Sequence, residues 1–338
     1  MRKIIATFAL YMASTDFNQL IKESLHNELR LFDNYLRESI HNNNPRISNV
    51  VKYIFGASGK YLRPILVLLS AKACGGITPE TYYGAVAVEL LHTASLVHDD
   101  VVDKSTMRRS QPSVNAVFGN TCAVLVGDYL LSTAALEGIK MGDIEIIKII
   151  SGLAKGLAEG EINQYVIATE VIIDEQEYFD VINKKTASLM RACTIIGAKT
   201  AGADEKTVAQ FGDLGEALGI AFQIRDDIFD YFSDDVGKPI GNDIREGKIT
   251  LPLIYALKNA PEGEAKQMTE IIYARNYSAE NIKKLFDFTK THGGIDYAYG
   301  KIDECIADAE KIVNELAIGD DEREMMRVLL HYLRDRKY

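Results

Sequence analysis

The chain has 338 residues, a net charge of −10 and a hydrophobic content of 47%. This size suffices for one large domain or two intimate ones, and the acidic balance excludes nucleic acid as a partner, because nucleic-acid binding needs clustered basic surface. The four cysteines, Cys74, Cys122, Cys193 and Cys305, have no C-x-x-C spacing, which indicates reduced thiols in a cytoplasmic protein and disfavours a zinc site.

The first residues have the pattern of a signal peptide, because Arg2 and Lys3 precede an apolar run that ends at Ala13. The run is short and polar residues follow it, and Met12 offers an alternative start. We therefore interpret residues 1–11 as an upstream extension. No later stretch reaches the roughly 18 to 20 uninterrupted apolar residues of a membrane-spanning helix, so we expect a soluble protein.

Apolar residues then recur at spacings of three and four, and only seven prolines occur, which predicts an all-α protein. Two predicted helices, 82–102 and 211–232, are apolar on most faces, as expected of helices buried inside a large bundle. Since no linker or short repeat interrupts the pattern, we treat residues 1–338 as a single helical domain. Turn-forming residues predict about ten to a dozen helices. The predicted breaks are 42–45, 56–60, 75–79, 111–112, 202–204, 237–247, 261–263 and 293–294.

Both of these apolar helices end in an acidic cluster of the form D-D-x-x-D. The clusters are Asp99, Asp100 and Asp103, and Asp226, Asp227 and Asp230. The first and last aspartates of each lie on one helix face, and six carboxylates around one cavity would raise each other's pKa unless cations neutralised them. Mg²⁺ usually binds one or two carboxylates together with substrate phosphates. One such cluster alone is best explained as a solvated helix end, but two predict a Mg²⁺ site for a phosphate-bearing ligand.

Basic residues lie on both sides of the first cluster. Lys60 and Arg63 stand near a predicted helix start, where the N-terminus and the cations both favour phosphate. Arg108 and Arg109 are adjacent guanidiniums that can each grip a different anion. His92 precedes the cluster by two turns on nearly the same face. Each feature alone is compatible with surface charge or with a core histidine.

More polar side chains follow later in the chain: Lys185, Thr186, Gln223, Lys238 and Lys248. The last two lie on a glycine-rich segment that could fold over the site as a lid.

In order, spacing and residue type, these motifs resemble the trans-isoprenyl diphosphate synthases over about residues 55–255, with long-chain members such as octaprenyl and solanesyl diphosphate synthases as the nearest type. The resemblance implies an all-helical bundle around a deep central cavity and a homodimer. It implies elongation of an allylic diphosphate by successive 1'-4 head-to-tail condensations with isopentenyl diphosphate. These two diphosphates would be the substrates, and release of the product would bring a transient association with a membrane surface.

The resemblance also implies roles for single residues. Asp99, Asp103 and Asp226 would bind Mg²⁺, and Asp100, Asp227 and Asp230 would support them. The allylic diphosphate would be held by Arg108, Lys185, Gln223 and Lys248. Isopentenyl diphosphate would be held by Lys60, Arg63, His92 and Arg109. Thr186 and Lys238 also match the pattern, and the catalytic group would be the six aspartates with Arg108, Lys185 and Lys248.

Product length in this family depends on what blocks the cavity behind the first cluster. Short-chain members carry bulky aromatic residues four or five positions before it, where this chain has Ser95 and Ala94. Leu91 and Val88, further back, are not aromatic either. We therefore predict a long-chain all-trans polyprenyl diphosphate of the kind used for quinone side chains. A short-chain farnesyl or geranylgeranyl diphosphate synthase is the alternative.

Two other classes are compatible with part of the pattern. A class I terpene cyclase also uses one D-D-x-x-D cluster, and a non-catalytic subunit of a heteromeric synthase usually lacks one of the two. The second cluster, together with basic residues for a second diphosphate, argues against both.

Overall fold

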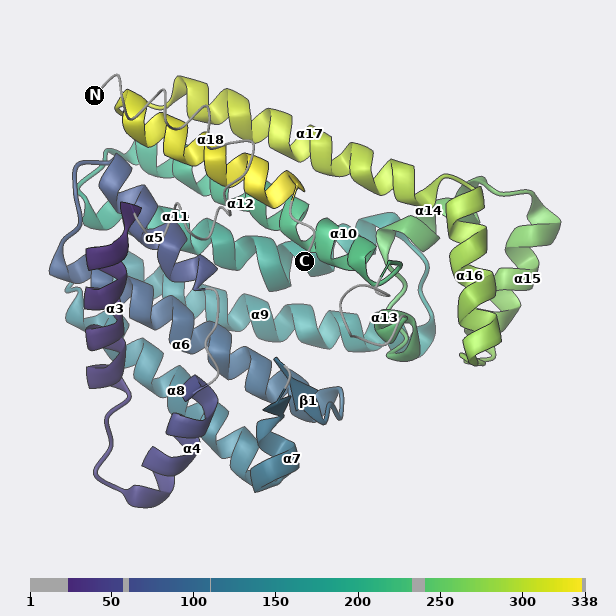
Figure 1. Ribbon diagram of the computed structural model, residues 1–338, viewed down its shortest axis with the longest axis horizontal. Helices are drawn as coiled ribbons and strands as arrows, with labels where there is room; N and C mark the ends of the chain where they lie inside the picture. Colours follow the sequence, from purple (N-terminus) through teal and green to yellow (C-terminus); the bar gives the residue numbers. More distant parts are fainter. Residues whose placement is uncertain (1–23, 57–60, 110, 233–240, 336–338) are drawn as a thin grey trace.

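The computed structural model describes residues 24–56, 61–109, 111–232 and 241–335, and in these ranges the predicted all-α class is confirmed (Figure 1). Residues 1–11 lie outside the described ranges. The helices are α3 (His26–Ser39), α4 (Pro45–Gly56), α5 (Leu62–Ala73), α6 (Pro79–Val102), α7 (Val114–Phe118), α8 (Asn120–Lys140), α9 (Ile144–Glu170), α10 (Glu175–Ile182), α11 (Ser188–Thr200), α12 (Glu205–Phe229), α13 (Asn242–Arg245), α14 (Leu251–Asn259), α15 (Glu262–Tyr273), α16 (Ala279–Thr291), α17 (Gly294–Glu315) and α18 (Asp320–Asp335). Strands β1 (Met107–Arg108) and β2 (Gln111–Pro112) pair as one short antiparallel hairpin.

The two apolar helices of the sequence analysis are α6 and α12, and both begin earlier than predicted. Thr78 caps α6 in a reciprocal capping box with Thr81, and Pro79 fits the first turn because no intrahelical partner is needed there. Asp204 caps α12 by accepting a hydrogen bond from the Thr207 backbone N–H. The capping residues therefore set the helix starts more accurately than the apolar pattern does.

The described ranges contain sixteen α-helices, from α3 to α18, which is more than predicted. Two of the additional breaks separate α8 from α9 and α9 from α10. At the second break Val171 adopts a left-handed backbone with φ 55°. Because β-branched residues rarely adopt this conformation, a valine is not a turn signal. The predicted break at 261–263 is shorter than expected, because α15 already begins at Glu262.

The main hydrophobic core contains buried residues of α3, α5, α6, α8 to α12, α14, α17 and α18. Within it α6 packs along α5, α8 and α11, and α12 packs between α11 and α17. Helices α15 and α16 form a hairpin that projects from the end of the bundle (Figure 1). The two helices that carry the acidic clusters therefore both run through the middle of the packing.

A π-helical turn, η1 (Asn183–Ala187), joins α10 to α11. Helices α9 and α12 both approach this turn closely, each at a glycine. A Cβ on Gly160 of α9 would lie 2.8 Å from Lys185 Cγ, and a Cβ on Gly219 of α12 would lie 2.4 Å from Ala187 Cα. Both glycines are needed for this approach. Turns of the π type are frequently found at functional sites.

One helix in the described ranges, α8, is long and apolar enough to cross a membrane by length and composition. Of its apolar window 44% is buried inside the bundle, as is common for the core helix of a soluble protein. The exposed remainder forms a stripe that includes Leu125 and Leu136.

Candidate active site

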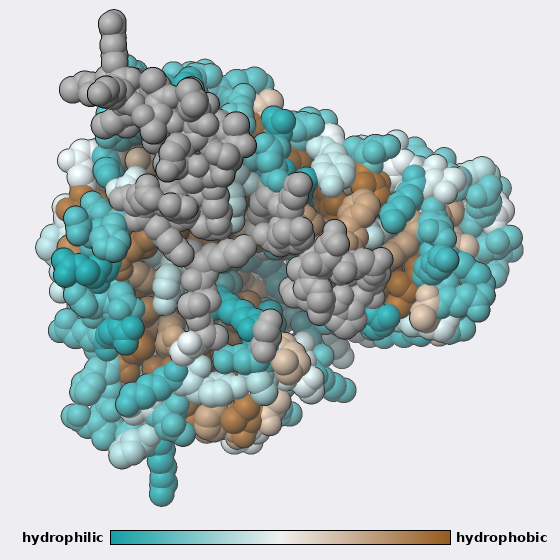
Figure 2. Space-filling model, in the orientation of Figure 1, coloured by the Kyte–Doolittle hydropathy of each residue, from teal (hydrophilic) through white to brown (hydrophobic). Residues whose placement is uncertain are grey.

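A cavity of about 440 Å³ opens between α6, α9, α10 with η1, α12 and residues 243–250. Figure 2 shows hydrophilic residues around a hollow near the middle of one face. The predicted site residues that line the cavity are Arg63, His92, Ser95, Asp99, Arg108, Lys185, Thr186, Gln223, Asp226, Asp227 and Lys248. Lys60 and Lys238 lie outside the described residues, so their predicted roles stay predictions.

Both acidic clusters lie at the C-terminal ends of their helices, where the helix dipole already disfavours negative charge. Asp99 lines the cavity, and burial raises its pKa to about 6. Such a site favours a bound cation, because its positive charge offsets both the unfavourable helix dipole and the desolvation of the carboxylates.

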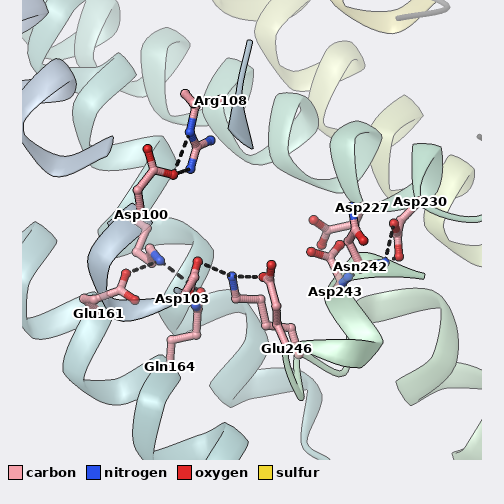
Figure 3. Close-up of polar contacts among 12 residues, drawn as sticks. Asp100, Asp103, Arg108, Glu161, Gln164, Asp227, Asp230, Asn242, Asp243 and Glu246 are labelled. Carbon is pink, nitrogen blue, oxygen red and sulfur yellow. Dashed lines mark hydrogen bonds and ion pairs between the residues drawn. The ribbon is translucent and has the colours of Figure 1, made fainter. Parts of the chain in front are cut away.

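In the first cluster, Asp100 is held by the protein. Its Oδ1 accepts hydrogen bonds from Arg108 Nε at 2.9 Å and from Nη2 at 2.5 Å (Figure 3). Only 2% of Asp100 is exposed. Asp103 contacts Lys248, whose Nζ lies 3.2 Å from its Oδ2. Asp100 therefore anchors Arg108, Asp99 lines the cavity, and Asp103 pairs with Lys248, a residue of the cavity lining.

In the second cluster, Asp227 and Asp230 both accept hydrogen bonds from donors of the protein. Asp227 accepts hydrogen bonds from Tyr178 OH at 2.6 Å and from Gln223 Nε2 at 2.8 Å. Asp230 accepts from the backbone N–H groups of residues 242 and 243, at 3.0 and 3.4 Å. Asp226 is the member of this cluster that lines the cavity beside Asp227. The three aspartates of this cluster therefore differ in their surroundings, and their metal-binding and supporting roles stay predictions.

The two cavity lysines are each paired with carboxylates. Lys185 forms an ion pair with Glu161 and donates to Gln164 Oε1 at 3.1 Å, both on α9. Lys248 contacts Asp103 and lies 2.7 Å from Glu246 Oε2. Burial opposes charge on Lys248, but these carboxylates raise its pKa above the usual value, so it stays protonated.

A second basic group lies where α5 begins, against α6. Arg63 and His92 both line the cavity, and Arg63 Nε is buried without a hydrogen-bond partner among the described residues. Burial lowers the pKa of His92 well below its usual value, and the neighbouring arginines lower it further, so His92 is neutral at pH 7. Arg109 is exposed and has a left-handed backbone with φ 51°. The two adjacent arginines therefore differ in their contacts, because Arg108 is hydrogen-bonded to Asp100 whereas Arg109 is exposed.

Of the four positions predicted to control product length, only Ser95 lines the cavity. Ala94, Leu91 and Val88 are at most 1% exposed and belong to the main core. Apolar side chains that line the cavity include Leu157 of α9 and Phe222 of α12. Ser95 is therefore the position from which a larger side chain would reach directly into the space.

Sequence reasoning missed several polar residues at the site: Glu89, Glu161, Gln164, Tyr178, Asp243 and Glu246. Glu161 and Gln164 are three apart on one helix, which is a detectable signal, but it is common on solvated helix faces. Glu89 is 4% exposed, and burial raises its pKa to about 7 against the opposing charges of Arg63 and Arg109. Nothing in the local sequence marks a glutamate within an apolar helix as part of a basic site.

The donor set fits a metal that binds together with phosphate. Within the described ranges no three Asp, Glu, His or Cys side chains are grouped closely enough to hold a metal alone. Mg²⁺ needs only one or two carboxylates when phosphate oxygens and waters complete its shell. Asp99 and Asp226 offer carboxylates from two helices to one cavity.

Comparison with known proteins identifies the family to which the chain is similar. Residues 44–289 match the family model described as polyprenyl synthetase. A geranylgeranyl diphosphate synthase from Sulfolobus acidocaldarius is 35% identical over 86% of this chain and 94% of its own. An octaprenyl diphosphate synthase from Haemophilus influenzae is also 35% identical, over 87% of this chain and 89% of its own. The crystal structure of a decaprenyl diphosphate synthase from Rhodobacter capsulatus superimposes with a TM-score of 0.89 at 33% identity, covering 95% of this chain and 99% of that one.

The burial of Glu89 predicts that Glu89→Gln stabilises the substrate-free protein at high pH. Because the pKa of Glu89 is about 7 in the folded protein and near about 4.3 when unfolded, the folded state binds this proton more tightly, and stability falls as pH rises between these values. We expect Glu89→Gln to melt roughly 3–6 °C higher than the parent at pH 8. At pH 5 the difference should be much smaller, because most of the destabilisation arises between pH 5 and pH 7.

Differential scanning calorimetry at both pH values checks this prediction, with the exposed Glu170→Gln as control. A stabilisation of the same size at pH 5 and pH 8 would contradict it.

Proposed function

Because this chain belongs to the polyprenyl synthetase family, we propose that it extends an allylic diphosphate by repeated 1'-4 condensation with isopentenyl diphosphate and releases a long-chain all-trans polyprenyl diphosphate. As a member of that family it is a prenyl-transferring enzyme. One observation carries the finer proposal. Aspartates of both clusters and two separate groups of basic residues line a single cavity with apolar walls.

We propose that the acidic side of the cavity activates the allylic diphosphate. Breaking its C–O bond leaves a carbocation and places the electron pair on the departing diphosphate, so the barrier falls when fixed positive charge meets that group. Lys185, Arg108 and Lys248 supply such charge, and Gln223 adds an amide beside them. Mg²⁺ bound through Asp99, Asp103 and Asp226 would neutralise more of the charge that develops on the leaving group.

The second set of cations suits the second diphosphate. Arg63 and His92 line the cavity, and Arg109 lies within electrostatic range of both. Neutral His92 can donate one hydrogen bond without adding charge. With Lys60, these residues would hold isopentenyl diphosphate while its double bond attacks the carbocation.

Two further parts of the proposed reaction are the exclusion of water by the cavity walls and the fate of the released proton. Leu157, Ile182 and Phe222 line the cavity and would keep water away from the carbocation. The proton lost after the new carbon–carbon bond forms would go to the departing diphosphate, and no side chain at the site is required as the base.

We propose a long-chain product, because among the described residues no aromatic side chain blocks the cavity beside the first cluster. Ser95 is small and faces the space, and Ala94 directly before it is small as well. The relatives include both short-chain and long-chain synthases at equal identity, so the support for chain length comes from these side chains. The product would serve as the precursor of a quinone side chain.

We propose that the chain works as a homodimer joined through α8 and α9. The described residues expose large apolar side chains along one stripe of α8: Val124, Leu125, Leu136 and Ile139. On α9, Ile162, Tyr165 and Val166 are exposed as well. Contiguous exposed apolar surface of this kind marks a contact with another protein or a membrane. A second copy is favoured, because α8 is already half buried in its own bundle.

We further propose that the enzyme acts in the cytoplasm and touches a membrane surface only when the product leaves. A long polyprenyl chain is apolar, so water is a poor destination for it. The net charge of −10 disfavours lasting attachment to anionic lipid.

The central prediction is activity of the purified single chain with Mg²⁺, isopentenyl diphosphate and farnesyl diphosphate. Asp99→Ala and Asp226→Ala should each lower kcat by about 100-fold or more, because each removes a carboxylate that would hold the metal. Mass spectrometry of the products and chelation with EDTA provide the measurements. Asp287→Ala, an exposed aspartate on α16, serves as control. Formation of a cyclic hydrocarbon from the allylic substrate alone would indicate a terpene cyclase instead.

The chain-length proposal predicts products longer than geranylgeranyl diphosphate. Ser95→Phe should shorten them, because its ring would enter the cavity. Ala94→Phe should also shorten them, with an added loss of stability from overpacking a fully buried position of roughly 1–3 kcal/mol. Leu31→Phe, on the exposed face of α3, should leave the product distribution unchanged. Release of only farnesyl or geranylgeranyl diphosphate by the parent protein would refute the proposal.

The dimer proposal predicts that Leu125→Asp combined with Leu136→Asp gives a monomer of 37.5 kDa, whereas the parent sediments at twice that mass. Burying these carboxylates at an apolar contact would cost more than the contact provides. Sedimentation equilibrium measures the mass, and Leu31→Asp is the matched control at an exposed leucine elsewhere. A monomeric parent protein at micromolar concentration would rule the proposal out.

A further inference from the structure

A chain of hydrogen bonds joins α10 and η1 to the last two turns of α12. Thr186 Oγ1 donates to Gln223 Oε1 at 2.7 Å, and Gln223 Nε2 donates to Asp227 Oδ1 at 2.8 Å. Tyr178 OH donates to the other carboxylate oxygen of Asp227 at 2.6 Å. Both oxygens of Asp227 are therefore engaged by protein donors. The last turns of α12 are held at two points.

Tyr178 is itself rigidly placed. It is 8% exposed and lines the cavity, and its ring packs edge-on against Phe179 at a centroid distance of 5.4 Å. Asp174 caps the first turn of the same helix by accepting hydrogen bonds from the backbone N–H groups of Gln176 and Glu177. The tyrosine therefore contacts Asp227 from a helix start that cannot fray freely.

Holding Asp227 also fixes its neighbour. Successive residues of an α-helix point about 100° apart, so the rotation of the final turn decides where Asp226 faces. Helix ends fray, and α12 ends at Phe229, only three residues later. In Figure 3, Asp227 and Asp230 lie together beside Asp243, apart from Asp100 and Asp103. Without a lock at Asp227, like-charge repulsion among these carboxylates would act on a loose turn.

We propose that Tyr178 is a positioning residue of the second aspartate cluster, whose hydroxyl locks Asp227 so that Asp226 is presented to a metal-bound diphosphate. This inference rests on the proposed function. Partners that orient metal ligands from behind typically change metal affinity or activity by about 10-fold to 100-fold when removed. Tyr178→Phe removes only the hydroxyl, and Asp227 Oδ2 would lose its donor.

The test compares Tyr178→Phe with Tyr297→Phe. Tyr297 OH donates to Glu175 Oε1 at the same 2.6 Å, but Tyr297 does not line the cavity. The readout is the rise in melting temperature caused by Mg²⁺ and inorganic diphosphate, titrated in Mg²⁺. We expect Tyr178→Phe to need about tenfold more Mg²⁺ for half of the rise. Tyr297→Phe should follow the parent protein.

Kinetics give the second readout. High Mg²⁺ should restore much of the rate of Tyr178→Phe, while KM for isopentenyl diphosphate at saturating Mg²⁺ stays within about twofold of the parent. A merely structural defect would lower the ligand-free melting temperature and would not be rescued by Mg²⁺. Should Tyr178→Phe fail to fold, Thr186→Val removes the donor at the other end of the chain and should show the same Mg²⁺ shift.

An unchanged Mg²⁺ requirement in the folded variant, Tyr178→Phe or Thr186→Val, would overturn the inference and leave the proposed function standing. A parent protein that Mg²⁺ and diphosphate do not stabilise would overturn both, so the two failures are distinguishable.

Discussion

This structure depends on one free-energy cost. Carboxylates are gathered at two helix C-termini around one partly dry cavity. Each carboxylate is disfavoured by burial, by its neighbours and by the helix dipole. The protein offsets the cost unevenly. Asp100 forms an ion pair with Arg108, whereas Asp230 accepts hydrogen bonds from backbone N–H groups and Asp227 accepts them from a tyrosine and an amide. Burial nevertheless raises the pKa of both Asp99 and Asp227 to about 6, and a bound cation would offset this cost of burying the charged form.

Most of the architecture follows from patterns that are local in sequence. Apolar spacing predicts the long buried helices, while the local caps Thr78 with Pro79 and Asp204 set their starts, which lie earlier than the apolar pattern indicates. Residues that act across the fold were harder to predict. Tyr178 meets Asp227 over 49 positions, and Glu89 meets Arg63 only because α5 packs on α6. A left-handed valine at position 171 cannot be anticipated either, because its backbone is imposed by the packing around it.

The features proposed to set product length are also divided between residues that are local in sequence and residues that the fold brings together. Small residues at positions 94 and 95 indicate where a block is missing, but the far wall is formed by α9 and α12, whose contribution depends on how closely these helices approach α6. Leu157 and Phe222 reach the cavity from those helices. Relatives of equal identity are named for products of different length. A few side chains on facing helices set the depth, while the surrounding fold stays the same.

The π-turn η1 contains one residue more than a regular helix would need between α10 and α11. Loss of a single residue from 183–187 would convert it to a regular α-helical turn and leave α11 in nearly the same orientation, because a π-turn takes up its extra residue locally. Leu189, Met190 and Cys193 would therefore stay buried in the core. The consequence of the extra residue is confined to the cavity wall, where Lys185 and Thr186 lie, and does not extend to the packing beyond it.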